Sequence, residues 1–236
     1  MSRRILAAAG AAAVAVVAGL AALLPGTGAS AATLPVSETQ FQQMFPNRIP
    51  FYTYTGLLDA MQKFPEFTGG GEDVAKREAA AFLANVGHES GGLVHVEELD
   101  RNVWEHYCDT TQPYGCPAGT AAYHGRGPIQ LSWNFNYKAA GDALGVDLLN
   151  NPDLVLNDAS VAWQTALWYW MTQTGPGSMT PHAAMAGGAG FGETIRSING
   201  AIECGGGNPG QVQSRVDSYR QFAQILGVDP GGNLSC

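Results

Sequence analysis

The chain has 236 residues and a formal net charge of −8, from 20 acidic and 12 basic side chains. This acidity argues against binding to a nucleic-acid backbone and against electrostatic attachment to anionic membranes or cell walls. We therefore expect neither nucleic acid nor a membrane as a partner. A neutral polymer is compatible with the charge, and the length fits one domain with a sizeable core.

The first 31 residues have the pattern of a secretory signal peptide. Arg3-Arg4 precedes a long apolar run, and Ala29-Ser30-Ala31 provides a small-residue cleavage site. An uncleaved membrane anchor is the competing interpretation, but no basic stop-transfer cluster follows the run. A twin-arginine export signal fits only weakly. We expect a secreted, extracellular monomer of residues 32–236, whose net charge becomes −10 because the leader holds two arginines and no acids.

Helical patterns dominate the chain beyond the leader. A helix is expected to start near Ser37, and the strongest helix covers residues 72–87, where apolar side chains recur every three or four positions. Further helices are expected at residues 54–64, 134–144, 160–172, 191–198 and 209–226. The aromatic face of residues 160–172 is interpreted as core. Residues 100–128 are rich in turn formers and carry the first cysteine pair, and residues 175–190 are expected to form a Gly/Pro/Met-rich loop.

Four cysteines remain after export to an oxidising compartment, so disulfides are expected. Three pairings are possible. We favour Cys108 with Cys116, which bracket a short loop, and Cys204 with Cys236, which would tie a late loop to the C-terminus. A metal site is not expected, because there is no CxxC pair and no histidine lies at ligand spacing from the cysteines.

Two carboxylates flank a glycine pair in the segment NVGHESGGLVHVEELD. Glu89 falls at the end of the strongest helix, just before Gly91-Gly92, and Glu98 follows. Glycoside hydrolysis needs one carboxyl that keeps its proton and another that is ionised. An ordinary exposed glutamate at a helix end is an equally good interpretation from spacing alone. His88-Glu89 is not a zinc-protease motif, because Gly92 stands where the second histidine ligand would be.

Amides and hydroxyls alternate with apolar residues from within the segment GRGPIQLSW onward. Gln130, Ser132, Asn134 and Asn136 have this spacing, which suits the hydroxyl and acetamido groups of a sugar. A half-buried strand with one wet face explains the spacing slightly better on physical grounds. Later in the chain, Arg215 could sit between two buried acids and tune one of them, or it could form a structural ion pair.

Five longer segments together closely resemble the family 19 glycoside hydrolases, which are chitinases. They are AAFLANVGHESGGL, YHGRGPIQLSWNFNY, LLNNPDLV, AWQTALWYWMT and GETIRSINGAIECGG, in the family's order between about Phe41 and Cys236. The resemblance, to the compact bacterial branch, implies a mainly α, lysozyme-like, two-lobed fold with a deep substrate cleft and little β structure. It also implies one catalytic domain that hydrolyses the β-1,4 bonds of chitin with endo action and inversion, and without a cofactor.

The resemblance also implies roles for individual residues. Glu89 would be the general acid and Glu98 the general base, while Ser132 and Asn199 would hold the water and the substrate acetamido group. The further expected residues are Gln130, Tyr123, Asn136 and His88 as sugar contacts, and Glu203 and Arg215 as a charge network around Glu89. Three positions depart from the family pattern: Ser90, which is usually threonine, His124, which is usually aromatic, and Gln164, which is often lysine in plant members.

Two other functions remain open at this point. A muramidase or endolysin that acts on peptidoglycan would have a similar architecture, although the acidic chain disfavours an anionic substrate. A catalytically silent chitin-binding protein is the alternative from another class, and the presence of both acids disfavours it.

Overall fold

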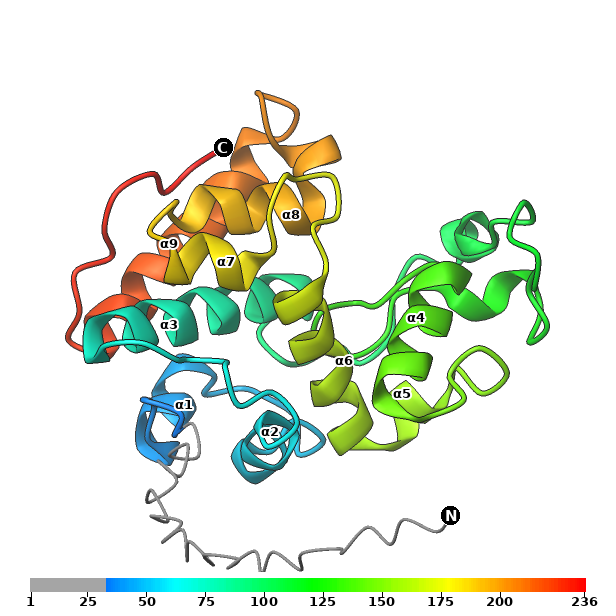
Figure 1. Ribbon diagram of the computed structural model, residues 1–236, viewed down its shortest axis with the longest axis horizontal. Helices are drawn as coiled ribbons and strands as arrows, with labels where there is room; N and C mark the ends of the chain where they lie inside the picture. Colours follow the sequence, from blue (N-terminus) through cyan, green and yellow to red (C-terminus); the bar gives the residue numbers. More distant parts are fainter. Residues whose placement is uncertain (1–32) are drawn as a thin grey trace, which may run out of the picture. The chain divides into compact units, whose positions relative to one another are not determined.

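The structure, a computed structural model, describes residues 33–236, so the predicted signal peptide at residues 1–31 lies outside the described residues. The described part consists of helices joined by loops (Figure 1). The elements are α1 (Glu38–Met44), α2 (Tyr54–Met61), α3 (Glu72–Glu89), η1 (Arg101–Tyr107), η2 (Thr120–Tyr123), α4 (Asn134–Leu144), α5 (Leu154–Asn157), α6 (Ala159–Thr172), α7 (Pro181–Ala186), α8 (Phe191–Glu203) and α9 (Pro209–Ile225). β structure within this part is limited to two isolated bridges. The prediction of a mainly α-helical fold is confirmed.

The helix starts follow the capping chemistry of the sequence. Ser37 accepts a hydrogen bond from the backbone N–H of Gln40 at 3.2 Å, and the Gln40 side chain accepts one from the Ser37 backbone at 2.9 Å. This reciprocal pair satisfies N–H groups that the first turn leaves without a helical partner. The predicted start near Ser37 is therefore confirmed. α6 begins in a similar way, since Asp158 accepts from the N–H groups of Ser160 and Val161.

The core is built around aromatic residues of α3 and α6. Trp163 and Trp170 of α6 are fully buried, as the sequence predicted, and Phe82 of α3 contacts both rings. Burial of each such side chain stabilises the fold by roughly 1.5–3 kcal/mol. The apolar stripe of α3 is likewise buried. α3 is therefore held firmly along its apolar face, and its C-terminal residue Glu89 has a well-defined position.

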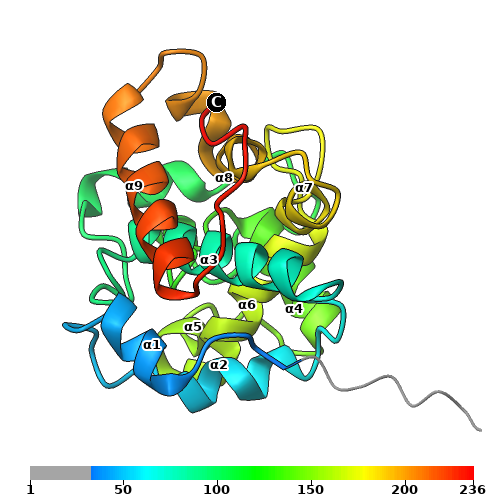
Figure 2. The same ribbon diagram turned by 90° about the vertical axis from the view of Figure 1, so that its left-hand side faces the viewer.

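Two lobes lie on either side of α6. Figure 1 shows α3, α7, α8 and α9 on one side and α4 and α5 on the other. α3 packs against α9, α7 and α8, whereas α6 packs against α2, α4 and α5. Figure 2 shows α9 crossing α3 in the first lobe. This is the predicted two-lobed, lysozyme-like arrangement. No helix of residues 33–236 is long and apolar enough to cross a membrane.

Three local predictions were wrong. The loop expected at residues 175–190 contains α7, which begins because Pro181 occupies the first helical turn and Thr180 accepts from the Ala183 N–H at 3.1 Å. α8 continues past residue 198 to Glu203 through a kink at Asn199. The half-buried strand considered around Gln130 is absent: the chain forms only an isolated Arg126–Leu131 bridge there, and Gln130 and Trp133 have φ of 53° and 75°, outside the extended region.

The two disulfides have the favoured connectivity. Cys108–Cys116 closes the loop that follows η1, and Cys204–Cys236 joins the end of α8 to the C-terminus. These two bonds use all four cysteines. The first bond stabilises the η1 region of one wall of the cleft described below, and the second stabilises the α8 region of the other wall.

Candidate active site

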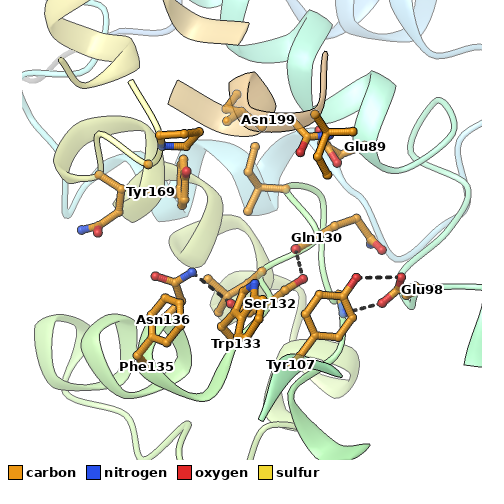
Figure 3. Close-up of a pocket in the computed structure, with 18 of the residues that line it drawn as sticks. Glu89, Glu98, Tyr107, Gln130, Ser132, Trp133, Phe135, Asn136, Tyr169 and Asn199 are labelled. Atoms are coloured by element: carbon orange, nitrogen blue, oxygen red, sulfur yellow. Dashed lines mark hydrogen bonds between the residues drawn. The ribbon is translucent and has the colours of Figure 1, made fainter. Parts of the chain in front are cut away.

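A cleft of about 1000 Å³ runs between the two lobes, and Figure 3 shows its lining. One wall comes from the ends of α3 and α6, the loop after α6, and α8. The other wall comes from residues 95–99, η1 and residues 125–136. The lining includes Glu89, Glu98, Tyr107, Gln130, Ser132, Trp133, Phe135, Asn136, Tyr169, Ile198, Asn199 and Ile202. The structure therefore brings together both predicted catalytic glutamates and four of the six predicted sugar- or water-binding residues.

Glu89 is the last residue of α3 and lies beside a buried charge network. Arg215 of α9 contacts the Glu89 carboxylate and donates two further hydrogen bonds to Glu203, from Nε at 2.8 Å and from Nη2 at 2.7 Å. Its Nη1 donates to Asn85 of α3 at 3.1 Å. Asn199, at the kink of α8, donates to Glu203 at 2.8 Å. Three helices thus converge on one guanidinium group.

The network contains two carboxyl groups, Glu89 and Glu203, and one cation, Arg215. Burial alone would raise the pKa of Glu203, but the hydrogen bonds and charge of Arg215, with the Asn199 hydrogen bond, outweigh it and lower that pKa. Burial would lower the pKa of Arg215, but Glu89 and Glu203 raise it. Glu203 is therefore ionised and Arg215 is charged. Since these two charges balance, the network is neutral when Glu89 carries a proton.

Glu98 has a different environment on the opposite wall. Its Oε1 accepts a hydrogen bond from the Tyr107 hydroxyl at 3.0 Å, and its Oε2 accepts one from the Gly125 N–H at 3.2 Å (Figure 3). Burial and the neighbouring Glu98 carboxylate raise the pKa of Tyr107 to about 12, so this hydroxyl keeps its proton at neutral pH. One side-chain donor and one backbone donor therefore face the two oxygens of the Glu98 carboxylate.

The backbone around Glu98 explains why glycine occupies position 125. The Glu98 N–H donates to the Gly125 carbonyl at 2.9 Å, and the Gly127 N–H donates to the Val96 carbonyl at 2.7 Å. A Cβ at Gly125 would lie 2.8 Å from Oε1 of Gln130 and 3.4 Å from Cβ of Glu98. A side chain at position 125 would displace the flexible end of Gln130 and crowd the Gln130 Cβ at 3.3 Å, so glycine leaves Gln130 in place beside Glu98.

Three predicted polar side chains of the same wall are fixed by hydrogen bonds to nearby backbone carbonyls. Gln130 donates to the Gly127 carbonyl at 2.9 Å, Ser132 donates to the Gln130 carbonyl at 2.9 Å, and Asn136 donates to the Ser132 carbonyl at 3.0 Å. Each of these bonds uses one donor hydrogen, so the second N–H of each amide and the side-chain oxygens of all three residues form no hydrogen bond with the described residues. The turn at Gln130 and Trp133 thus offers both donors and acceptors to a ligand that carries N–H, O–H and carbonyl groups.

Residues 36–236 match the family described as chitinase class I, glycoside hydrolase family 19. The chain belongs to this family. A crystal structure of chitinase C from Streptomyces griseus is 67% identical, with a TM-score of 0.85 over 86% of this chain and 98% of that one. A second bacterial family 19 chitinase structure is 70% identical, with a TM-score of 0.84 over 86% of this chain and 100% of that one.

Plant members of family 19 are more distant. Endochitinase B of Zea mays is 46% identical over 188 residues, which are 79% of this chain and 63% of that protein. Chitinase 6 of Oryza sativa subsp. japonica is 47% identical over 188 residues, which are 79% of this chain and 66% of that protein. The chain therefore spans slightly less than two thirds of the length of these plant relatives.

Two residues predicted as sugar contacts of this family 19 member are not part of the cleft lining. Tyr123 is fully buried, and its hydroxyl donates to the Leu149 carbonyl at 2.8 Å. His88 faces α9, where its Nδ1 lies 3.3 Å from the Ser214 hydroxyl, and burial followed by the charge of Arg215 lowers its pKa. The contacts of both side chains are with the protein itself, and sugar contact by either one stays a prediction.

Sequence reasoning missed the aromatic part of the family 19 cleft. Trp133 lies edge-on to Tyr107, with ring centroids 5.6 Å apart, and is stacked with Phe135 at 5.5 Å. Trp133 is 37% exposed, and Ile202 on the opposite wall is 64% exposed. Such apolar faces suit the C–H faces of a sugar ring. Within residues 33–236, His, Cys, Asp and Glu form no cluster of three that could hold a metal ion.

Proposed function

We propose that this protein is a secreted chitinase that hydrolyses the β-1,4 bonds of chitin within the chain and with inversion. The observation that carries this proposal is the contrast between the two glutamates of one cleft. Glu89 lies beside a charge pair that is already balanced, and Glu98 accepts hydrogen bonds from two fixed donors. One carboxyl can hold a proton while the other stays ionised, which is what inverting glycoside hydrolysis requires.

Glu89 acts as the general acid. When the glycosidic oxygen lies against the end of α3, the protonated Glu89 carboxyl donates its proton to the leaving sugar. The Glu89 carboxylate that results has Arg215 as a partner, so the negative charge that develops in this step is stabilised. Glu203 keeps Arg215 in place and keeps its charge balanced before the step.

Glu98 acts as the general base. It takes a proton from a water molecule that attacks the anomeric carbon from the face opposite to Glu89. Inversion requires space for this water, so we expect the two carboxyl groups to be roughly 6.5–9.5 Å apart, or slightly more in an open cleft. Ser132 and the amide of Asn199 bind the water and the substrate acetamido group. The lining of the cleft by both residues supports this assignment.

The substrate class follows from the walls of the cleft. The polar lining consists largely of amides and hydroxyls, which can bind the acetamido and hydroxyl groups of a neutral N-acetylglucosamine polymer. The lining also offers exposed apolar surface at Trp133 and Ile202. The matched family and the names of its relatives support chitin as that polymer. The two disulfides support export to an oxidising compartment.

Timed anomer analysis of the products from a chitin hexamer tests the proposal. We expect internal cleavage, and we expect the new reducing ends to appear first as α-anomers, since the β bond is inverted in one displacement. Initial β-anomers would contradict inversion. Clearing of bacterial cell walls with no cleavage of the hexamer would identify a peptidoglycan hydrolase, and binding without products would identify a silent chitin-binding protein.

A further inference from the structure

His124 is a buried histidine whose two ring nitrogens both face acceptors. It follows η2 and is only 2% exposed. Its Nδ1 lies 2.7 Å from the Ala121 carbonyl oxygen, and its Nε2 lies 2.9 Å from Oε1 of Glu97. A neutral imidazole has one N–H and one lone pair, so it would place a lone pair against one of these oxygens. Only the imidazolium form donates to both acceptors.

The ring of His124 is also stacked on an indole. The Trp104 ring of η1 lies parallel to it, at an angle of 8° and a centroid distance of 3.5 Å. A charged imidazolium is attracted to the electron-rich face of tryptophan. Two hydrogen bonds therefore fix the His124 ring within its own plane, and the stacked Trp104 ring fixes it in the perpendicular direction.

Two partners of His124, Glu97 and Trp104, and the next residue in the chain, Gly125, lead to the Glu98 carboxylate. Glu97 directly precedes Glu98 in the chain. Gly125 directly follows His124, and its N–H donates to Oε2 of Glu98. Trp104 belongs to the same 3-10 helix as Tyr107, whose hydroxyl donates to Oε1 of Glu98. The residues that hold Glu98 thus come from three segments, and all three segments meet at His124.

We infer that His124 is a positioning residue for Glu98, an inference that rests on the proposed role of Glu98 as the base. The His124 ring joins the Glu97–Glu98 segment, the Gly125 backbone and η1, so that both oxygens of Glu98 keep their donors. His124 is not part of the cleft lining and touches no substrate. Its effect on the reaction therefore passes through Glu98.

The charged and titratable groups around His124 come from every element that packs against it. From the segment before η1, Glu97 faces Nε2 directly. In η1, the Arg101 guanidinium lies 5.2 Å from the Trp104 ring that stacks on His124. The His124 carbonyl accepts from the Tyr137 hydroxyl of α4 at 2.9 Å and lies 3.4 Å from Nη1 of Arg126. Arg126 is in turn paired with Asp153 at 2.9 Å. Glu97 is therefore the carboxylate that contacts the His124 ring.

His124→Phe tests the inference, because phenylalanine keeps the stack on Trp104 and loses both hydrogen bonds. We expect kcat on the chitin hexamer to fall about 10- to 100-fold, the effect of a misplacement near 1 Å, with little change in KM. We also expect the low-pH limb of kcat/KM to move to higher pH, since a carboxylate with weakened donors is protonated more easily. His106→Phe is the matched control: His106 is exposed on η1, and its replacement should change neither quantity.

A second pair of variants keeps the test valid if His124→Phe does not fold. Glu97→Gln preserves shape and removes the charge that faces Nε2, and it should lower kcat as His124→Phe does. His124→Gln, which can still donate to Glu97, should recover part of the lost kcat. In His124→Phe/Glu97→Gln, the losses should not add, because the two residues act as one unit.

A lower melting temperature with unchanged kcat and an unchanged low-pH limb, in either His124→Phe or Glu97→Gln, would show a purely structural role and overturn the inference. This outcome differs from a failure of the proposed function. If the proposed function were wrong, the unmodified protein would not cleave the hexamer, or Glu98→Gln would retain activity.

Discussion

The two walls of the cleft present their glutamates in different ways. Glu89 ends an 18-residue helix that is packed in the core, and its neighbours Arg215 and Glu203 are almost completely buried. Glu98 lies in an irregular segment that is held by isolated bridges, a 3-10 helix and a histidine. The Glu89 wall therefore depends on buried charges, and the Glu98 wall depends on hydrogen-bond donors from loops. The two walls should respond differently to substitution.

Removal of either acid should have the largest effect on activity. Glu89→Gln and Glu98→Gln should each lower kcat on the chitin hexamer by at least 10²- to 10⁴-fold, the usual contribution of a positioned proton donor or acceptor. Their circular dichroism should match that of the unmodified protein. Glu105→Gln, an exposed residue of η1, serves as the control. If Glu98→Gln retained most of its activity, Glu98 would not be the base.

Glu203→Gln should affect both stability and activity, because it leaves Arg215 with Glu89 as its only carboxylate partner. Breaking a buried pair from one side costs about 3–5 kcal/mol, to be measured as the loss of unfolding free energy in urea. Glu89 would then be held ionised by Arg215, so proton donation should be lost and kcat should fall about 100-fold or more. If Glu203→Gln were destabilised but fully active, the charge balance around Arg215 would not be needed for catalysis.

Tyr107→Phe probes the opposite wall and should have a smaller effect. It removes one donor to Glu98, and a hydrogen bond of this kind contributes about 1.5 kcal/mol, so kcat/KM should fall about tenfold. The unfolding free energy should change much less than in Glu203→Gln. Tyr114→Phe is the control, since the Tyr114 hydroxyl bonds to Gln112 outside the cleft. If Tyr107→Phe and Glu203→Gln lost the same unfolding free energy, the two walls would not differ in how they are stabilised.

A histidine of the first lobe should give a pH-dependent stability. His182 of α7 contacts buried Glu78 of α3 at 2.6 Å, and this hydrogen bond, against the opposing effect of burial, raises the pKa of His182. The stabilisation is therefore complete below the ordinary histidine pKa of about 6.5 and is lost as pH rises through the raised value. His182→Gln should lower the melting temperature more at pH 5.5 than at pH 9. An equal loss at both pH values would assign His182 a packing role only.

The features that the sequence predicted best are those with a regular period or a chemical pairing rule. The apolar stripe predicted α3 to within two residues of its end, and the spacing of the cysteines favoured the observed disulfides. The short helix α7 was missed because glycines and prolines surround it. The alternation around Gln130 suggested a strand, whereas residues with positive φ turn the chain there.

Prediction of the candidate site from the sequence is limited in a similar way. His88 and Glu89 are adjacent in sequence, but successive residues of a helix point about 100° apart, so His88 faces α9 while Glu89 faces the cleft. Tyr107 belongs to a 3-10 helix without a periodic pattern, and its contact with Glu98 joins segments whose pairing no local rule predicts. Such residues become visible only when the backbone path is known.

The convergence of three helices on Arg215 has a consequence for how the protein matures. Asn85 and Glu89 are early in the chain, Glu203 is late, and Arg215 lies on α9, the final helix. A partly folded chain that has not docked α9 leaves both carboxylates without their cation. During refolding, recovery of activity should therefore report the arrival of α9, and it should lag behind any spectroscopic signal that follows burial of the tryptophans of α6.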